Sequence, residues 1–342
     1  MKKFLAMALA LLMVCVMLPV TAMAASGVKM GGTEYPTLKA AVDAAPTDGT
    51  ETTIEFLGSH TGEGVQVKAG QNLVIKFNGC TYTLTPSGAG SNGTKTAGFQ
   101  LLKGSTVKFI GGTVNISDIN LTYTKDETYT GPEERSCNIM RLIQSYADVT
   151  LTDMTFDATN FYGGPQDYAL SFNKGQVNIN GNTSITGNEG KIAFDSCDGS
   201  WAGSGVYNDN PLTAITIDTT GTISGYIEMS GGNLTIEDIN LNGGITLYGN
   251  NTNYGANVIV NGGTFTDAES VKPYLAEGLT INSNGTVVNT PIVIIVPDDS
   301  TDTTTTTEKP ANPATGANDF VGVTAALAVV SLLGMAVASR KK

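Results

Sequence analysis

The sequence predicts an all-β protein, a single-stranded parallel β-helix (a solenoid) with a small capping helix at its N-terminal end. The main observation is a short repeat, clearest in residues 234–241 (LTIEDINL) and 258–265 (VIVNGGTF). Each copy alternates apolar and polar residues, turns at Asp or Gly, and resumes with an apolar residue, which indicates two short strands joined at a corner. Copies start at residues 215, 234, 258 and 279. This spacing suits stacked repeats and is too short for a βαβ unit of about 30 residues.

Further copies occur at residues 75–82, 107–114 and 149–156, and a variant one residue longer starts at residues 177, 215 and 279. Additional short strands are expected at residues 226–229 and 244–248, each just ahead of a copy. An antiparallel β-sandwich or barrel is the alternative, because Asn-Gly and Gly-Gly corners also form hairpins. The solenoid is favoured because every copy keeps the same order of residues.

The only convincing helix is expected at residues 37–45. Its apolar residues Leu38, Ala41, Val42 and Ala45 follow the spacing of one helix face. Pro36 and Pro46 flank it at positions that helices tolerate. A small amphipathic helix before the first repeat would cover the open apolar end of a solenoid.

Three motifs follow one another early in the exported chain: residues 35–42 (YPTLKAAV), 53–56 (TIEF) and 73–79 (LVIKFNG). Together they resemble the opening of pectin-lyase-like right-handed β-helix proteins of bacterial surfaces. The resemblance continues through GGTF at 262–265 and YLAEG at 274–278 to about residue 288. It implies a right-handed parallel β-helix over residues 25–290. These motifs specify a fold rather than an activity, since one fold hosts many functions.

Both ends of the chain carry targeting features. Residues 1–24 have the two lysines, the apolar run and the small-residue cleavage site of a secretory signal peptide. Residues 291–311 form a Thr-rich stalk or linker, and residues 312–342 add an apolar stretch and a basic tail. This last segment resembles the cell-wall sorting signal of Gram-positive bacteria, with an NPxTG motif of Asn312, Pro313, Ala314, Thr315 and Gly316. The resemblance implies cleavage by a sortase after Thr315, attachment to the wall, and contact with the membrane only before sorting.

Charge and cysteine content restrict the partners. Without residues 1–24 and 316–342 the chain has 14 basic and 30 acidic residues, a net charge of −16. Nucleic acid is therefore not an expected partner, and polyanions are repelled. Cys80, Cys137 and Cys197 remain, an odd number without Cys-x-x-Cys spacing, so neither a disulfide framework nor a zinc site is expected. Cys80 occupies a corner of the repeat, where a packed free thiol is expected.

No catalytic residues are identified. The only histidine, His60, lies in a Gly-rich turn and is expected to be a solvated loop residue. The motifs of the related polygalacturonases and pectate lyases are absent. A polysaccharide lyase or glycoside hydrolase remains the alternative function, since carboxylates distant in sequence could meet on neighbouring repeats.

Ligand binding is the expected function, and irregular segments are the expected place for it. Residues 122–145, 161–167 and 193–212 interrupt the repeat, and in a solenoid such interruptions form external loops. Trp201, Tyr162 and Tyr207 could stack on sugar rings, and Asp195, Asp198 and Asp209 lie around them. These carboxylates could hold Ca²⁺, although their spacing fits no ordered loop, so no metal or other cofactor is expected.

We therefore expect a secreted, wall-anchored adhesin or ligand-binding module that recognises a glycan or a protein of a host or neighbouring cell. A passive structural spacer is a further alternative.

Overall fold

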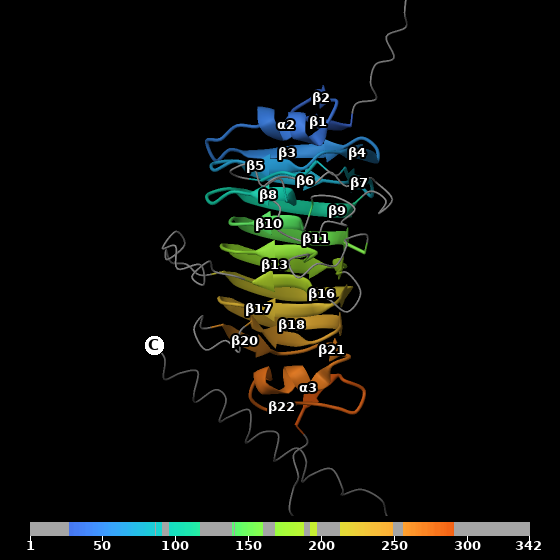
Figure 1. Cartoon of the computed structure of the whole chain (residues 1–342), viewed down its shortest axis with the longest axis vertical. Coiled ribbons are helices and arrows are strands. Elements are labelled where there is room, and N and C mark those ends of the chain that lie inside the picture. Colours follow the sequence, from blue (N-terminus) through green and yellow to red (C-terminus); the bar gives the residue numbers. More distant parts are fainter. Residues whose placement is uncertain are drawn as a thin grey trace, which may run out of the picture. The chain divides into compact units, whose positions relative to one another are not determined.

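The protein is nearly all β, with two sheets of parallel strands stacked along one direction (Figure 1). The computed structural model describes residues 27–85, 87–90, 96–116, 139, 141–159, 168–187, 192–196, 213–248 and 256–290. All of them belong to one compact unit, Met1–Pro291. The expected signal peptide, stalk and sorting signal lie outside the described residues.

The larger sheet contains 14 of the described strands. Its main path is β2 (Thr33–Tyr35), β1 (Val28–Met30), β3 (Glu51–Phe56), β6 (Asn72–Lys76), β9 (Thr106–Ile116), β11 (Asp148–Asp157), β13 (Gln176–Gly181), β16 (Ala214–Ser224), β18 (Asn233–Asn242) and β20 (Asn257–Val260). Four short strands complete it: β4 (His60–Gly62), β7 (Thr81–Leu84), β14 (Ser184–Thr186) and β21 (Thr264–Phe265).

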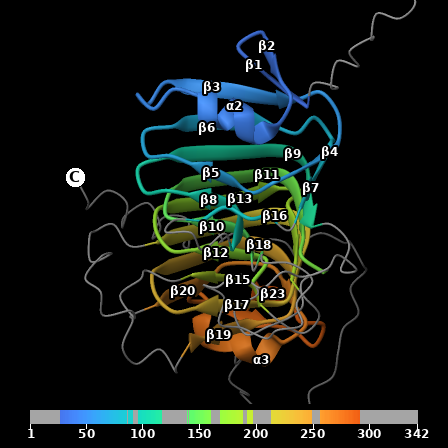
Figure 2. The same cartoon turned by 45° about the horizontal axis from the view of Figure 1, so that its top comes forward.

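The smaller sheet takes one strand from each repeat. Its seven strands are β5 (Val65–Val67), β8 (Ala97–Leu101), β10 (Arg141–Ser145), β12 (Leu170–Phe172), β15 (Ile192–Ser196), β17 (Tyr226–Met229) and β19 (Ile245–Leu247). The tilted view of Figure 2 shows these strands beside those of the larger sheet. The expected strands at residues 226–229 and 244–248 are thus confirmed as β17 and β19.

Equivalent strands of successive repeats pair in parallel and in register. Val149 of β11 lies between Val107 of β9 and Val177 of β13, and Leu151 lies in the same way between Phe109 and Ile179. Among the described strands, antiparallel pairing is confined to the two ends, at β1 with β2 and β3, and at β22 with β23. The described strands therefore do not form the antiparallel sandwich or barrel.

The corner inside each copy of the repeat explains its preference for Asn, Asp and Gly. Asn78 and Asp153 have φ values of 53° and 55°, and Gly111 and Gly181 at equivalent corners have 66° and 64°. This left-handed region is open to Gly and tolerated by Asn and Asp. A Cβ added at Gly181 would also collide with the carboxylate of Asp153.

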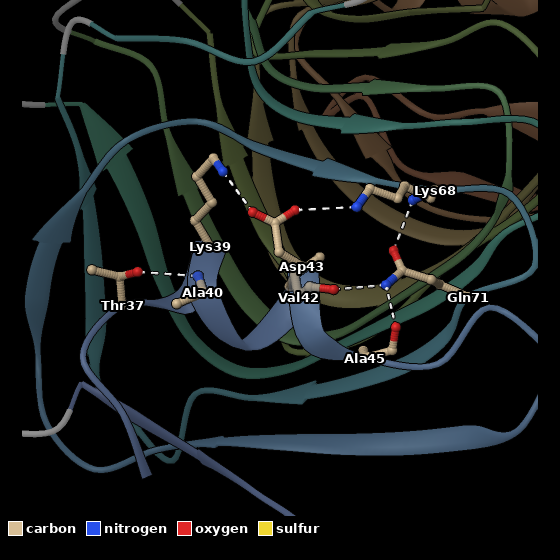
Figure 3. Close-up of polar contacts among 8 residues, drawn as sticks. All are labelled: Thr37, Lys39, Ala40, Val42, Asp43, Ala45, Lys68 and Gln71. Carbon is tan, nitrogen blue, oxygen red and sulfur yellow. Dashed lines mark hydrogen bonds and ion pairs between the residues drawn. The ribbon is translucent and has the colours of Figure 1, made fainter.

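The N-terminal end of the stack is covered by α2 (Leu38–Ala44), which confirms the expected helix. The Thr37 hydroxyl caps it by accepting the Ala40 N–H at 3.1 Å, and its apolar face is buried. Buried Gln71 donates to the carbonyls of Val42 (2.7 Å) and Ala45 (3.1 Å) at the other end (Figure 3). Gln71 thus gives the Val42 carbonyl a second donor beside the Ala45 N–H and supplies a donor to the Ala45 carbonyl at the helix end.

The C-terminal end differs from the expectation. The copy of the repeat that starts at residue 279 does not add another parallel layer. It forms β22 (Leu279–Ile281), which pairs antiparallel with β23 (Val287–Asn289). Together with α3 (Ala268–Val271) and the short helix η4 (Lys272–Tyr274), this hairpin follows the last strands of the stack. The turn at Asn282 causes the reversal, because its side chain accepts the N–H groups of Asn284 and Thr286.

No helix among the described residues is long and apolar enough to cross a membrane. The apolar stretch at residues 320–338 lies outside that part of the chain.

The assignment of faces can be tested at two neighbouring residues of β18. Ile236 is fully buried and Glu237 is exposed. Ile236→Asp should lower the free energy of unfolding by about 4 kcal/mol, because it buries an unpaired carboxylate. Glu237→Gln is the control and should change it by less than about 0.5 kcal/mol. Urea denaturation measures both, and equal losses would contradict the assignment.

Candidate functional site

Three long connections lead into or out of strands of the smaller sheet. Residues 117–140 join β9 to β10, residues 158–169 join β11 to β12, and residues 197–213 join β15 to β16. Within the larger sheet, the corner from β6 to β7 takes only residues 77–80. Two of the segments expected to be external loops are therefore partly strand, because residues 141–145 form β10 and residues 193–196 lie in β15.

A ladder of glutamine side chains runs across the first repeats of the smaller sheet. Gln66, Gln100 and Gln144 occupy equivalent positions on β5, β8 and β10. The Gln66 amide donates to Gln100 Oε1 at 2.7 Å, and the Gln100 amide donates to Gln144 Oε1 at 3.4 Å. An amide side chain carries both a donor and an acceptor, so such a ladder satisfies itself.

The same register continues into hydroxyl and carboxylate groups. Gln144 is followed on the next strands by Ser171, Asp195, Glu228 and Thr246. We call these seven residues, from Gln66 to Thr246, the polar row. It consists of one side chain from every strand of the smaller sheet.

The polar row lies on the face of the smaller sheet that points away from the packed interior. Phe99 packs edge-on against Phe109 of the larger sheet, with ring centroids 5.1 Å apart. Side chains alternate between faces along a strand, so the neighbouring Gln100 points the other way. The row is nevertheless shielded in its middle: Gln100, Ser171 and Asp195 are 2%, 3% and 8% exposed, whereas Gln144 and Glu228 are half-buried.

Two carboxylates meet in this row. Asp195 of β15 and Glu228 of β17 are direct neighbours in the parallel register, about 4.8 Å apart along the sheet. The Tyr168 hydroxyl donates to Glu228 Oε1 at 3.4 Å. Asp195 Oδ1 is buried and has no hydrogen-bond partner among the described residues.

Burial controls the ionisation of both carboxylates. Desolvation raises the pKa of Asp195 to about 6, against the smaller opposing effects of the Ser171 side chain and the Arg141 charge. Desolvation also raises the pKa of Glu228, and the Tyr168 hydroxyl acts against it. Burial and the neighbouring carboxylates raise the pKa of Tyr168, which therefore stays protonated.

Of the ligand-binding residues expected from the sequence, the structure describes only Asp195. Trp201, Tyr162, Tyr207, Asp198 and Asp209 lie outside the described residues. The sequence analysis missed Glu228, Tyr168 and the glutamine ladder. A signal was present, because Ala193-Phe194-Asp195-Ser196 and Tyr226-Ile227-Glu228-Met229 share one pattern, an inward apolar residue followed by an acid.

His60 is not the solvated loop residue that the sequence suggested. It lies in β4 and its ring stacks on Phe56, with centroids 4.8 Å apart, and contacts the edge of Tyr82. The half-buried Cys80 is a free thiol packed against the core. Within the described ranges no three His, Cys, Asp or Glu side chains are grouped closely enough to hold a metal ion.

Comparisons with protein-family models, with curated proteins and with solved structures find no match to this chain.

The raised pKa of Asp195 predicts a pH dependence of stability. Its folded pKa of about 6 lies above the ordinary value of 3.8, so the folded state holds a proton that the unfolded state releases as pH rises from about 4 to 6. Over that window Asp195 destabilises the protein, by up to about 3 kcal/mol.

Asp195→Asn removes this titration. The variant should therefore gain stability relative to the parent protein between pH 4 and pH 7, measured as the difference in urea denaturation free energies. If the variant and the parent protein differ in unfolding free energy by the same amount at pH 4 and at pH 7, the raised pKa of Asp195 is contradicted.

Proposed function

We propose that the chain is a right-handed, single-stranded parallel β-helix displayed on a bacterial cell wall, and that it binds a glycan. The fold assignment is supported by the in-register parallel pairing between repeats and by the resemblance of the first repeats to pectin-lyase-like proteins. Right-handed crossovers between parallel strands are the strong general preference.

The observation that carries the binding proposal is the polar row on the outer face of the smaller sheet, whose strands are joined to the rest of the chain by three long connections. Amide, hydroxyl and carboxylate groups spaced about 4.8 Å apart provide a regular series of donors and acceptors. A polymer of repeated sugar units presents hydroxyl groups in a similarly regular series. The half-buried Gln144 and Glu228 would make the accessible contacts.

We propose that the aromatic and acidic residues expected from the sequence contribute to the same site. Trp201 and Tyr207 belong to the connection after β15, and Tyr162 belongs to the connection before β12. We propose that their rings stack on the sugars, and that Asp198 and Asp209 accept hydrogen bonds from sugar hydroxyls. A protein ligand on another cell would contact the same connections. A passive spacer would have no use for these connections or for the polar row.

An enzyme is the second candidate function, and one observation favours it. Asp195 and Glu228 are paired carboxylates with raised pKa values, which is how glycoside hydrolases keep one carboxyl group protonated as the acid. Release of shorter sugars from a bound polysaccharide would identify this activity.

Glycan binding can be tested with the purified full chain on a glycan array. Gln144→Ala should weaken binding to the recognised glycan by about 5- to 150-fold, the effect of losing a contact of about 1 to 3 kcal/mol. Trp201→Ala should have a similar effect. The matched control is Asn178→Ala, an exposed amide on β13 of the larger sheet. Equal effects of Gln144→Ala and Asn178→Ala would place the binding surface elsewhere.

Wall attachment is a separate proposal that rests on Asn312, Pro313, Ala314, Thr315 and Gly316. A sortase would cleave after Thr315, and the stalk of residues 291–311 would hold the β-helix away from the wall. Thr315→Ala should move the mature protein from the wall fraction to the membrane or the medium, as fractionation and immunoblotting would show. Unchanged wall attachment in this variant would refute the sorting signal.

A further inference from the structure

We propose that a cavity at the last repeat, between β21, α3 and the turn from β22 to β23, binds an uncharged sugar residue of a glycan chain. The inference rests on the proposed glycan binding for its class of ligand. It adds a second site, on elements that do not contribute to the polar row.

The cavity has a volume of about 510 Å³, within the range of about 300 to 1,000 Å³ that is usual for small-molecule sites. It is lined by residues 264–266, by Ala268, Glu269 and Lys272, and by residues 281–285. The elements that carry these residues, β21, α3 and β22, follow one another at the C-terminal end of the stack (Figure 1).

Backbone hydrogen bonds hold the hairpin turn against β21. The Phe265 N–H donates to the Gly285 carbonyl at 2.9 Å, and the Val287 N–H donates to the Gly263 carbonyl at 2.9 Å. Gly285 has a left-handed φ of 80°, and a Cβ at this position would lie 2.2 Å from the Phe265 carbonyl oxygen. This wall of the cavity is therefore pre-formed, which lowers the entropy lost when a ligand binds.

The lining carries no net charge. Glu269 and Lys272 are its only charged side chains, and they form an ion pair with each other. A charged ligand would give up its hydration here without gaining an uncompensated partner of opposite charge. The cavity therefore favours an uncharged ligand.

Polar side chains in the lining retain hydrogen-bonding groups for a ligand. Asn282 Oδ1 accepts the N–H groups of Asn284 and Thr286 at 2.9 and 3.1 Å, which leaves two N–H donors on the Asn282 amide. Within the described part of the chain, the Ser283 hydroxyl and the Asn284 amide have no hydrogen-bond partner. Sugar hydroxyls both donate and accept, so they match this mixture of groups.

The apolar part of the lining is small and aliphatic. Ile281 and Ala268 are half-buried, and the only aromatic member, Phe265, is 2% exposed. The cavity thus offers no ring face on which a nucleic-acid base could stack. It also offers no aromatic anchor of the kind that dominates protein interfaces. A sugar ring, which is mostly polar with small C–H faces, fits this lining better than either.

A row of uncharged polar side chains on the outer face of the larger sheet ends at the cavity. We call it the hydroxyl row: Thr81, Thr113, Thr155, Ser184, Thr222, Asn240 and Thr264. Each member is at least partly exposed and is followed by a buried apolar residue. Elsewhere the outer face of this sheet carries ion pairs, such as Lys108 with Glu51. A linear glycan held in the cavity can therefore extend along a row that has no charged member.

The test measures the binding of four hexasaccharides to the purified full chain by isothermal titration calorimetry. Three probes are uncharged, the hexasaccharides of glucose, mannose and galactose, and the fourth is the hexasaccharide of galacturonic acid. We expect at least one uncharged probe to bind, and the galacturonic acid probe to bind at least about tenfold more weakly.

Two variants test the cavity itself. Asn284→Ala removes an amide from the lining, and Ala268→Phe adds a ring to its wall. Each should weaken binding of the uncharged probe at least about tenfold. Asn289→Ala is the matched control, because Asn289 is an exposed amide on β23 of the same hairpin and does not line the cavity. Thermal denaturation checks that the variants are folded, and Asn284 is exposed, so its substitution should leave the melting temperature unchanged.

The polar-row variant Gln144→Ala separates this site from the one proposed above. Weaker binding in Asn284→Ala and Ala268→Phe, with Gln144→Ala and Asn289→Ala unchanged, supports the cavity. Weaker binding in Gln144→Ala, with both cavity variants unchanged, overturns the cavity and leaves the proposed function intact. Equally tight binding of the galacturonic acid probe, or no binding of any uncharged probe, also overturns the cavity. If the glycan array gives no hit either, the proposed function is overturned as well.

Discussion

The structure depends on one constraint, the in-register parallel pairing of successive repeats. It places equivalent residues about 4.8 Å apart in continuous rows, so a residue in one repeat is stacked on a residue of similar type in the next. Rows of Val, Ile, Leu and Phe fill the interior. Buried hydroxyls also have to find partners: Thr183 donates to the carbonyl of Asn180 at 2.7 Å, and Thr219 donates to the carbonyl of Thr183 at 2.9 Å.

The same constraint means that the two ends of the stack need additional structure to cover them. A parallel layer always leaves strand edges and apolar side chains for a further layer to cover. At the first repeats, α2 buries its apolar face, and Gln71 joins the end of the helix to the second repeat. At the last repeats, the Ser270 hydroxyl of α3 accepts the N–H of Ile245 from β19. Different local structures thus cover the apolar side chains and strand edges at the two ends of the stack.

The sequence predicted what is local and missed what depends on alignment between repeats. Alternation in residues 234–241 and the apolar spacing of residues 38–45 are properties of single segments. The helix is confirmed, and residues 234–241 are confirmed as strand, although they form the single strand β18 and not two strands. Residues 279–281 have the same alternation, but no pattern within them says whether the next strand runs parallel or antiparallel. The polar row could not be predicted from the sequence for a related reason. Its members come from seven strands separated by connections of very unequal length, so their register cannot be read from spacing.

The chemistry of the polar row changes along its length, from amides to hydroxyl and carboxylate groups. The glutamine ladder closes on itself, because each amide offers a donor to the next acceptor. The ionised carboxylates of Asp195 and Glu228 cannot form such a ladder, because an ionised carboxylate carries no donor group of its own. The amides of the row therefore pair with one another, whereas its carboxylates take donors of other kinds. Tyr168 donates to Glu228, and the Ser171 side chain hydrogen-bonds to Asp195.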